Sequence, residues 1–205
     1  MLSNTDTTVT AAGARLWAQP DWATRPAILA ADDVLTYGEL HRRVGVAAAA
    51  LHAAGVQPGD YVAVAMERSP AQLVAILCVM AAGACPCPLE PRLAHAETAR
   101  RVAAVGLAWM LFDDDHAATA QGCGLAPARC LPAQELARGD SAWPRLPRGA
   151  RDPGLLLFTS GSTGHPKGVL LSHGGLMNNA CGVLAHTGPV SYTHLRAHET
   201  EADIV

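Results

Sequence analysis

The segment Thr159–Gly168 has the sequence T-S-G-S-T-G-H-P-K-G and lies between two apolar runs, Leu155–Phe158 and Val169–Leu171. Apolar runs that adjoin a glycine-rich segment on both sides favour a strand, a tight loop and a second strand over a flexible linker. Glycine lets the backbone approach a ligand closely, and successive backbone N–H groups can form a concave site for anions. The segment therefore predicts a loop that binds an oxyanion such as a phosphate group.

Lys167 is the only lysine in the chain, beside fourteen arginines. The compact ammonium group of lysine acts on phosphate as a point charge, whereas arginine presents a planar fork of donors. The segment is not a Walker A motif, because that motif places Gly-Lys directly before Ser or Thr at the start of a helix. Here Pro166 precedes the lysine, Gly168 follows it, and a strand-like run comes next.

The composition limits the class of protein. The chain has 205 residues, of which 50% are hydrophobic and 16% are charged, and its formal net charge is −3. These values favour a globular domain or part of a larger one, and they give no indication of a nucleic-acid or anionic membrane partner. The uncharged segment Leu73–Leu89 is broken by Gly83, Pro86 and Pro88. We therefore expect a buried helix leading into a buried strand there, and not a membrane span.

Two helix starts carry capping signals. Thr36 precedes a helical run and Glu39 follows three residues later, which predicts a capping box. Ser69 precedes Pro70 and lies three residues before Gln72, so a second helix is predicted to begin there.

Strand-like and helical segments alternate at short spacing, which predicts an α/β fold with a mostly parallel sheet flanked by helices. The expected strands are 26–30, 34–35, 60–66, 84–89 and 107–112, and the expected helices are 36–55, 69–83 and 95–105. Residues 1–26 are expected to form an extended lead-in. Residues 116–153 are rich in alanine, proline, glycine and arginine and are expected to form a loop-rich connection.

The cysteines, the acidic triplet and His173 are residue types that can bind metals, but we expect structural roles for them. The six cysteines contain no C-x-x-C pair, so we expect buried, unpaired thiols in a reducing cytoplasm. Asp113–Asp115 are expected to be solvated carboxylates at the end of a strand, and His173 is expected to be a packed or solvent-facing residue and not a catalytic one. No metal site is predicted.

Three segments, in this order, resemble the signatures of the adenylate-forming enzymes. This superfamily of AMP-dependent synthetases and ligases includes acyl-CoA synthetases, the adenylation domains of nonribosomal peptide synthetases, and luciferases. Leu35–Leu40 is similar to the first signature. Met80–Ala84 followed by Pro88–Pro91 resembles the second, with Glu90 in place of the usual aspartate. Thr159–Gly168 resembles the phosphate-binding signature.

The resemblance implies that residues 1–189 are an incomplete part of the large N-terminal α/β domain of such an enzyme. Members activate a carboxylate with ATP and Mg²⁺ to an acyl-adenylate, and then pass the acyl group to a thiol. The resemblance assigns ATP phosphate binding to Thr159, Ser160, Gly161, Ser162, Thr163, Gly164 and Lys167. The lid lysine and the adenine- and ribose-binding motifs of the family are absent from this chain, so no catalytic residue is assigned and the fragment itself is expected to be inactive. Its apolar faces are expected to pack partly against later chain.

The resemblance leaves open which kind of full-length protein contains this chain. An acyl-CoA ligase would use coenzyme A as the acyl acceptor, and a peptide synthetase adenylation domain would use the phosphopantetheine arm of a carrier domain. Ser172–Leu176 resembles the ligases slightly more. A nucleotide-binding module without chemistry and a phosphate-loop kinase or NTPase are alternatives, which pyrophosphate release by the parent would exclude. The expected partners are a small carboxylic acid and ATP, and the expected location is the cytoplasm.

The segment Val190–Thr200 reads V-S-Y-T-H-L-R-A-H-E-T and has no helical or strand period. It resembles the translation of a transposase adapter used to prepare DNA sequencing libraries. We therefore expect residues 190–205 to be a non-native tail and the native sequence to end near Pro189. His194 and His198, spaced as i and i+4, are then excluded as a metal site.

Overall fold

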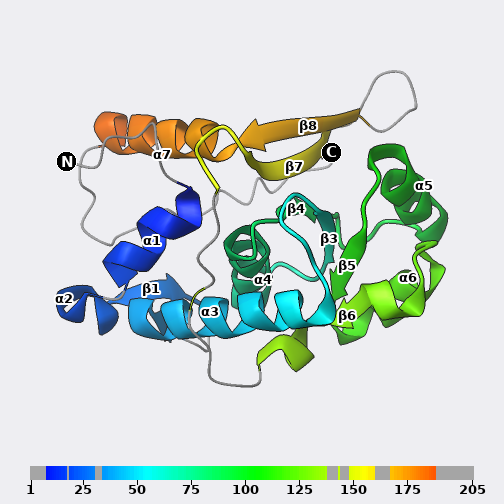
Figure 1. Cartoon of the computed structure of the whole chain (residues 1–205), viewed down its shortest axis with the longest axis horizontal. Helices are drawn as coiled ribbons and strands as arrows, with labels where there is room; N and C mark the ends of the chain where they lie inside the picture. The colour runs from blue at the N-terminus through cyan, green and yellow to red at the C-terminus, as the bar shows by residue number, and fades with distance from the viewer. Residues whose placement is uncertain are drawn as a thin grey trace, which may run out of the picture.

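The computed structural model of this chain describes residues 8–17, 19–30, 34–137, 143, 148–159 and 167–187. In Figure 1 a small parallel sheet lies between helices on its two faces, and a long hairpin followed by helix α7 runs along one side of the molecule.

The elements have the following bounds. The helices are α1 Val9–Trp17, α2 Pro20–Ala23, α3 Tyr37–Ala54, α4 Pro70–Ala81, α5 His95–Val105, α6 Ala117–Gly122 and α7 His173–Thr187, with the short 3₁₀ helices η1 Asp114–His116, η2 Pro127–Arg129 and η3 Ala133–Ala137. The strands are β1 Pro26–Leu29, β2 Val34–Thr36, β3 Tyr61–Ala65, β4 Cys85–Pro88, β5 Trp109–Phe112, β6 Cys130–Pro132, β7 Pro153–Thr159 and β8 Lys167–Ser172.

The central sheet has four parallel strands in the order β4-β3-β5-β6. The register places Val62 of β3 between Pro86 of β4 and Trp109 of β5. The predicted α/β fold with a mostly parallel sheet flanked by helices is thus confirmed. The predicted hairpin near the N-terminus is also present, because β1 and β2 pair antiparallel.

Side chains of successive strand residues point to opposite faces of the sheet, so the sheet has two cores. Val62 and Val64 belong to the core under α3 and α4, where Val44 and Leu51 of α3 are fully buried. Ala63 belongs to the core on the other face, which α5 and α6 cover. Because the side chains of β3 alternate between the two faces, this short apolar strand packs against helices on both sides of the sheet.

Both predicted helix caps are present. The Oγ1 atom of Thr36 accepts a hydrogen bond from the Glu39 N–H at 3.2 Å, and Ser69 caps α4 in the same way. The other half of the predicted capping box, a hydrogen bond from the Thr36 N–H to the Glu39 side chain, is wrong. The Glu39 carboxylate instead accepts hydrogen bonds from Arg42 and Arg43, each at 2.8 Å. These two hydrogen bonds lower the pKa of Glu39 to about 2.

Two expectations about irregular chain are corrected. Residues 1–26 were expected to be extended, but α1 and α2 lie within them, and α1 packs against α3 and α7. Within residues 116–153 the chain forms α6 and β6, and β6 adds a parallel strand to β5. These elements are short, and tertiary packing stabilises them more than local sequence preference does.

Within the described ranges, none of the helices combines the length and the hydropathy that crossing a bilayer requires. All six cysteines are unpaired thiols, and four of them are buried. The thiols of Cys123 and Cys130 lie 3.7 Å apart.

Candidate functional site: the base of the glycine-rich loop

The predicted strand, loop and strand form a hairpin. Strand β7 pairs antiparallel with β8, and the register places Thr159 opposite Lys167 and Phe158 opposite Gly168. The Oγ1 atom of Thr159 donates a hydrogen bond to the carbonyl oxygen of Lys167 at 3.5 Å. The two strands therefore bring both ends of the loop 160–166 together.

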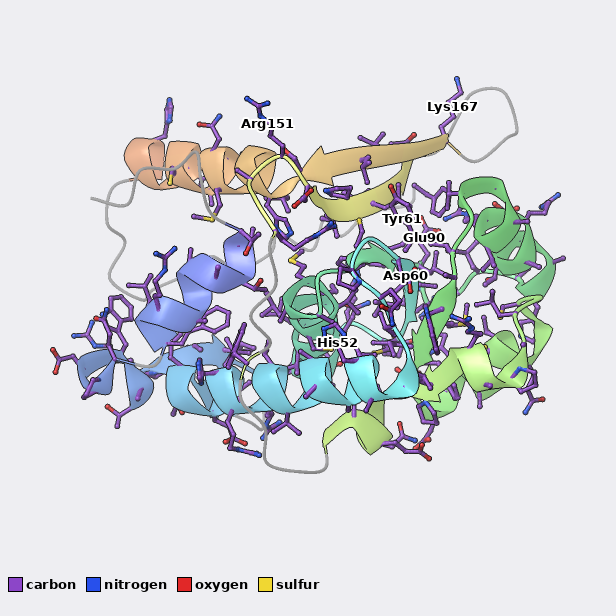
Figure 2. The ribbon with its side chains drawn as sticks, in the orientation of Figure 1. His52, Asp60, Tyr61, Glu90, Arg151 and Lys167 are labelled. Carbon is purple, nitrogen blue, oxygen red and sulfur yellow. The ribbon has the colours of Figure 1, made fainter. Side chains whose placement is uncertain are left out.

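Of the seven predicted phosphate-binding residues, the structure describes two. Thr159 ends β7, Lys167 begins β8, and both are exposed. Figure 2 shows the Lys167 side chain projecting from the start of β8 away from the parallel sheet. The other five, Ser160, Gly161, Ser162, Thr163 and Gly164, lie outside the described residues.

The hairpin is anchored on the second core of the sheet. Leu156 is buried in that core and Phe158 packs against it. A Cβ atom at Gly168 would lie 3.0 Å from Cδ1 of Leu156 and 3.2 Å from Cγ1 of Val105 in α5. Glycine at this position therefore lets β8 approach α5 closely, which fixes the strand that carries Lys167.

A cation beside the loop base was not predicted from the sequence. The guanidinium carbon of Arg101 lies 5.0 Å from the centre of the Phe158 ring, and Arg101 Nε donates to Glu97 at 3.0 Å. The spacing of Glu97 and Arg101 signals an ion pair within α5. The contact with Phe158 joins residues distant in sequence, and no local pattern could have indicated it.

His173 is a packed residue, as expected. It begins α7, its side chain is only 1% exposed, and its Nδ1 atom accepts a hydrogen bond from the Val9 N–H at 3.5 Å. Burial and the nearby charge of Arg148 lower the pKa of His173. A neutral imidazole that accepts a backbone hydrogen bond joins α7 to α1, which is a structural role.

Of the three carboxylates expected to be solvated at the end of β5, Asp114 and Asp115 are exposed, but Asp113 is only 25% exposed and has a structural role. Asp113 caps η1 through the His116 N–H and accepts the Glu67 N–H at 2.8 Å, and Asp114 accepts from Gln134 at 2.7 Å. In the part of the chain that the structure describes, no group of three or more His, Cys, Asp or Glu side chains could hold a metal ion.

Chemically, the described part of the site offers the exposed residues Thr159 and Lys167, which lie opposite each other in the register at the base of a glycine-rich loop. A small anion is the ligand that such groups attract. The fold and the loop together define the class: an α/β protein whose β7–β8 hairpin carries a candidate anion-binding loop.

Comparison with known proteins identifies the family. The family model described as AMP-binding enzyme matches residues 17–199. The chain belongs to the AMP-binding enzyme family.

Curated relatives come from two branches of this family. The chain is 42% identical over 153 residues to a feruloyl-CoA synthase of an Amycolatopsis species. This alignment covers 75% of this chain and 31% of that protein. It is 36% identical over 152 residues to pyochelin synthetase PchE of Pseudomonas aeruginosa, covering 74% of this chain and 10% of that protein. The chain therefore spans about a third or less of the length of these relatives.

Solved structures agree with this assignment. The N-terminal subdomain of NpsA from Klebsiella oxytoca, in complex with 3-hydroxyanthranilyl-AMSN, has a TM-score of 0.69 and 27% identity, covering 81% of this chain and 40% of that one. The nonribosomal peptide synthetase FmoA3 in its α-methyl-L-serine-AMP bound form has a TM-score of 0.75 and 27% identity, covering 88% of this chain and 20% of that one.

Proposed function

We propose that the full-length protein containing this chain is an ATP-dependent carboxylate-activating ligase. It forms an acyl-adenylate with release of pyrophosphate and then transfers the acyl group to a thiol, most simply that of coenzyme A. The 42% identity to a feruloyl-CoA synthase supports the coenzyme A acceptor. The 205-residue chain alone is inactive in this proposal, since it spans only 31% of that relative.

The loop residues bind the polyphosphate of ATP in this proposal. Hydroxyl and backbone N–H groups of Ser160, Ser162 and Thr163 donate to the β- and γ-phosphates, and Gly161 and Gly164 allow the loop to bend closely around them. Thr159 anchors the entrance of the loop, and Lys167 neutralises phosphate charge. Mg²⁺ would arrive bound to ATP, where it shares the phosphate charge. The described residues hold no cluster that would bind the metal by itself.

One observation carries the proposal. The antiparallel register brings Thr159 and Lys167 directly opposite each other at the two ends of the loop. Because Lys167 is exposed and the strand that bears it is held close to α5, its ammonium group is accessible to a phosphate from a fixed backbone position.

The experiment is substitution of Lys167 in the full-length protein, with carboxylate-dependent pyrophosphate release as the assay. Losing one charge-assisted hydrogen bond costs about 1.5–3 kcal/mol, so Lys167→Ala should lower kcat/KM for ATP about 10- to 100-fold. Lys167→Arg should recover part of the loss. Arg151→Ala is the control, because Arg151 is exposed before β7 and is assigned no role. Unchanged kcat/KM in Lys167→Ala would refute phosphate binding by this residue.

A second candidate is an adenylation domain that loads a carrier domain. The match to PchE favours it, and so does the similarity to an artificially fused adenylation and PCP di-domain of NpsA and ThdA, with a TM-score of 0.72. The two candidates differ in the acceptor. Thioester formation on free coenzyme A supports the ligase, whereas transfer only to a phosphopantetheinylated carrier domain supports the adenylation domain.

We further propose a cytoplasmic location, supported by six unpaired cysteines. The non-native origin of residues 190–205 also stays a proposal, because they lie outside the described residues and the family match continues to residue 199. A genomic read that continues through Val190–Val205 would refute it.

A further inference from the structure

A cavity separate from the glycine-rich loop lies at the carboxyl ends of strands β3 and β5. Its volume is about 290 Å³, and α3, α4, η1 and η3 contribute to its walls. In Figure 1 the longest of these helices, α3, runs below the sheet, whereas the β7–β8 hairpin lies above it. The volume is close to the lower end of the range found for small-molecule sites, roughly 300–1,000 Å³.

The strand order places this cavity at the switch point of the parallel sheet. From β3 the chain passes through α4 to β4 on one side, and then returns through α5 to β5 on the other side of β3. The two connections cover opposite faces, since α4 packs in the first core and α5 in the second. In open parallel sheets, ligands bind outside the carboxyl ends of the strands where the connections diverge in this way.

The walls of the cavity are mostly apolar. Met66, directly after β3, is 2% exposed, and Leu136 of η3 is 7% exposed. Val74, Ala75 and Cys78 of α4 complete the apolar surface. These side chains suit an aliphatic or aromatic body of a ligand.

Charged groups of both signs line the rim. Arg43 donates through Nε to Glu39 at 2.8 Å, and its two terminal nitrogens form no hydrogen bond or ion pair with another residue that the structure describes. Asp114 accepts from Gln134 at 2.7 Å through Oδ1, which leaves Oδ2 for a further donor. The neighbouring Asp113 is already committed, because it accepts hydrogen bonds from His116 and the Glu67 N–H.

We propose that this cavity binds a small zwitterion with an apolar body, of the type of an apolar amino acid. Arg43 holds its carboxylate, Asp114 holds its ammonium group, and Met66, Val74 and Leu136 contact its side chain. A simple acid would lie next to the negative charge of Asp114, and a simple amine would lie next to the positive charge of Arg43, which Glu39 pairs with only through Nε. Only a ligand with both charges satisfies both rim residues.

The test uses the full-length protein with ¹³C-labelled methionine methyl groups and L-leucine as the probe. Met66 lines the cavity, whereas Met110 is fully buried in the core on the other face of the sheet and serves as the internal control. Met66→Leu assigns the resonance. Leucine should shift the Met66 signal in a saturable manner and leave the Met110 signal in place. Binding of leucine elsewhere in the protein would not produce this pattern.

Arg42 and Arg43 form a matched pair of variants, because both donate to Glu39 and only Arg43 lines the cavity. Arg43→Gln should weaken leucine binding about tenfold or more, and Arg42→Gln should change it less than about twofold. 3-Methylbutylamine and 4-methylpentanoate, which each lack one charge of leucine, should bind at least about tenfold more weakly than leucine.

Three results would overturn the proposal. They are a Met66 signal that does not respond to leucine, equal affinities of the Arg42 and Arg43 variants, and analogues that bind as well as leucine. Similar melting temperatures of the two arginine variants exclude misfolding as the cause of a difference. The glycine-rich loop takes no part in this test, so its outcome is independent of the proposed ligase activity.

Discussion

Asp113 joins three parts of the chain, and its replacement tests how the carboxyl ends of the strands are held. Its Oδ2 atom accepts the Glu67 N–H at 2.8 Å, which connects the chain after β3 to the end of β5. Its Oδ1 atom accepts the His116 N–H at 3.2 Å and contacts the His116 ring at 2.5 Å. Asp113→Ala removes all three interactions.

The expected loss follows from the number and exposure of these bonds. A hydrogen bond to a charged group contributes about 1.5–3 kcal/mol when it is protected from water, and much less when it is exposed. The Asp113 side chain is 25% exposed and that of His116 is 6% exposed. We expect Asp113→Ala to lower the free energy of unfolding by about 2–3 kcal/mol, mostly through His116. Asp113→Asn keeps an acceptor and should lose about half of that amount.

The loss should depend on pH. Burial opposes charge on both groups, but hydrogen bonds from His116 and from the Glu67 N–H outweigh it at Asp113 and lower its pKa below the ordinary value of 3.8. At His116 the bonds to Asp113 and to the Pro91 carbonyl likewise outweigh burial and raise the pKa above 6.5. The aspartate contribution is complete above 3.8 and is lost as pH falls. The histidine contribution is complete below 6.5 and is lost as pH rises through the higher, folded-state pKa.

The assay is urea unfolding of the full-length protein, followed by tryptophan fluorescence, at pH 5, 6, 7 and 8. The difference between wild type and Asp113→Ala should be largest near pH 5 and should shrink toward pH 8. A difference below about 0.5 kcal/mol at pH 5, or one that grows from pH 5 to pH 8, would refute this account of the contact.

Two further substitutions and one chemical modification test the helices and the buried core that hold the site in place. Thr36→Ala should lower the free energy of unfolding by about 1 kcal/mol, because it removes the cap of α3; urea midpoints check this. Gly55→Ala should lower it by about 1 kcal/mol or more, since Gly55 has φ of 103°, and an unchanged midpoint would contradict the left-handed cap. Cys78, Cys85 and Cys87 should resist alkylation by iodoacetamide at pH 8 until urea unfolds the protein, because burial raises the pKa of each thiol to about 12. Mass spectrometry of native and unfolded samples decides this last point.

Local signals in the sequence predicted the elements whose stability is largely local. Thr36 and Ser69 predicted helix starts because each places a side-chain oxygen directly before an apolar periodic run. Such an oxygen accepts a hydrogen bond from a free backbone N–H in the first turn of the helix. The helix 95–105 was predicted with the bounds that the structure shows. Glu39 failed as a capping-box partner because two arginines, three and four residues later, offer its carboxylate stronger, charge-assisted bonds than a backbone N–H does.

Elements that depend on distant partners were missed. Helix α6 has six residues, too few to be stable alone, and it forms where Ala120 packs into the second core. Strand β6 has three residues and forms where β5 offers an unpaired edge. For the candidate site, the sequence predicted the hairpin and the position of Lys167. It could not predict Arg101 against Phe158, because that contact depends on how α5 packs on the hairpin.

The same dependence explains why the position of Lys167 is a property of the whole fold and not of the glycine-rich segment alone. A two-stranded hairpin is marginally stable in water by itself. Here Leu156 and Phe158 attach β7 to the second core, and Gly168 lets β8 lie against Val105. On the face opposite to Leu156 and Phe158, the cross-strand pair of Leu157 and Val169 is 37% and 42% exposed, and there we still expect later chain to pack. The hairpin is therefore supported by α5 and the parallel sheet from one side, whereas Leu157 and Val169 on its other side are partly exposed in the part of the chain that the structure describes.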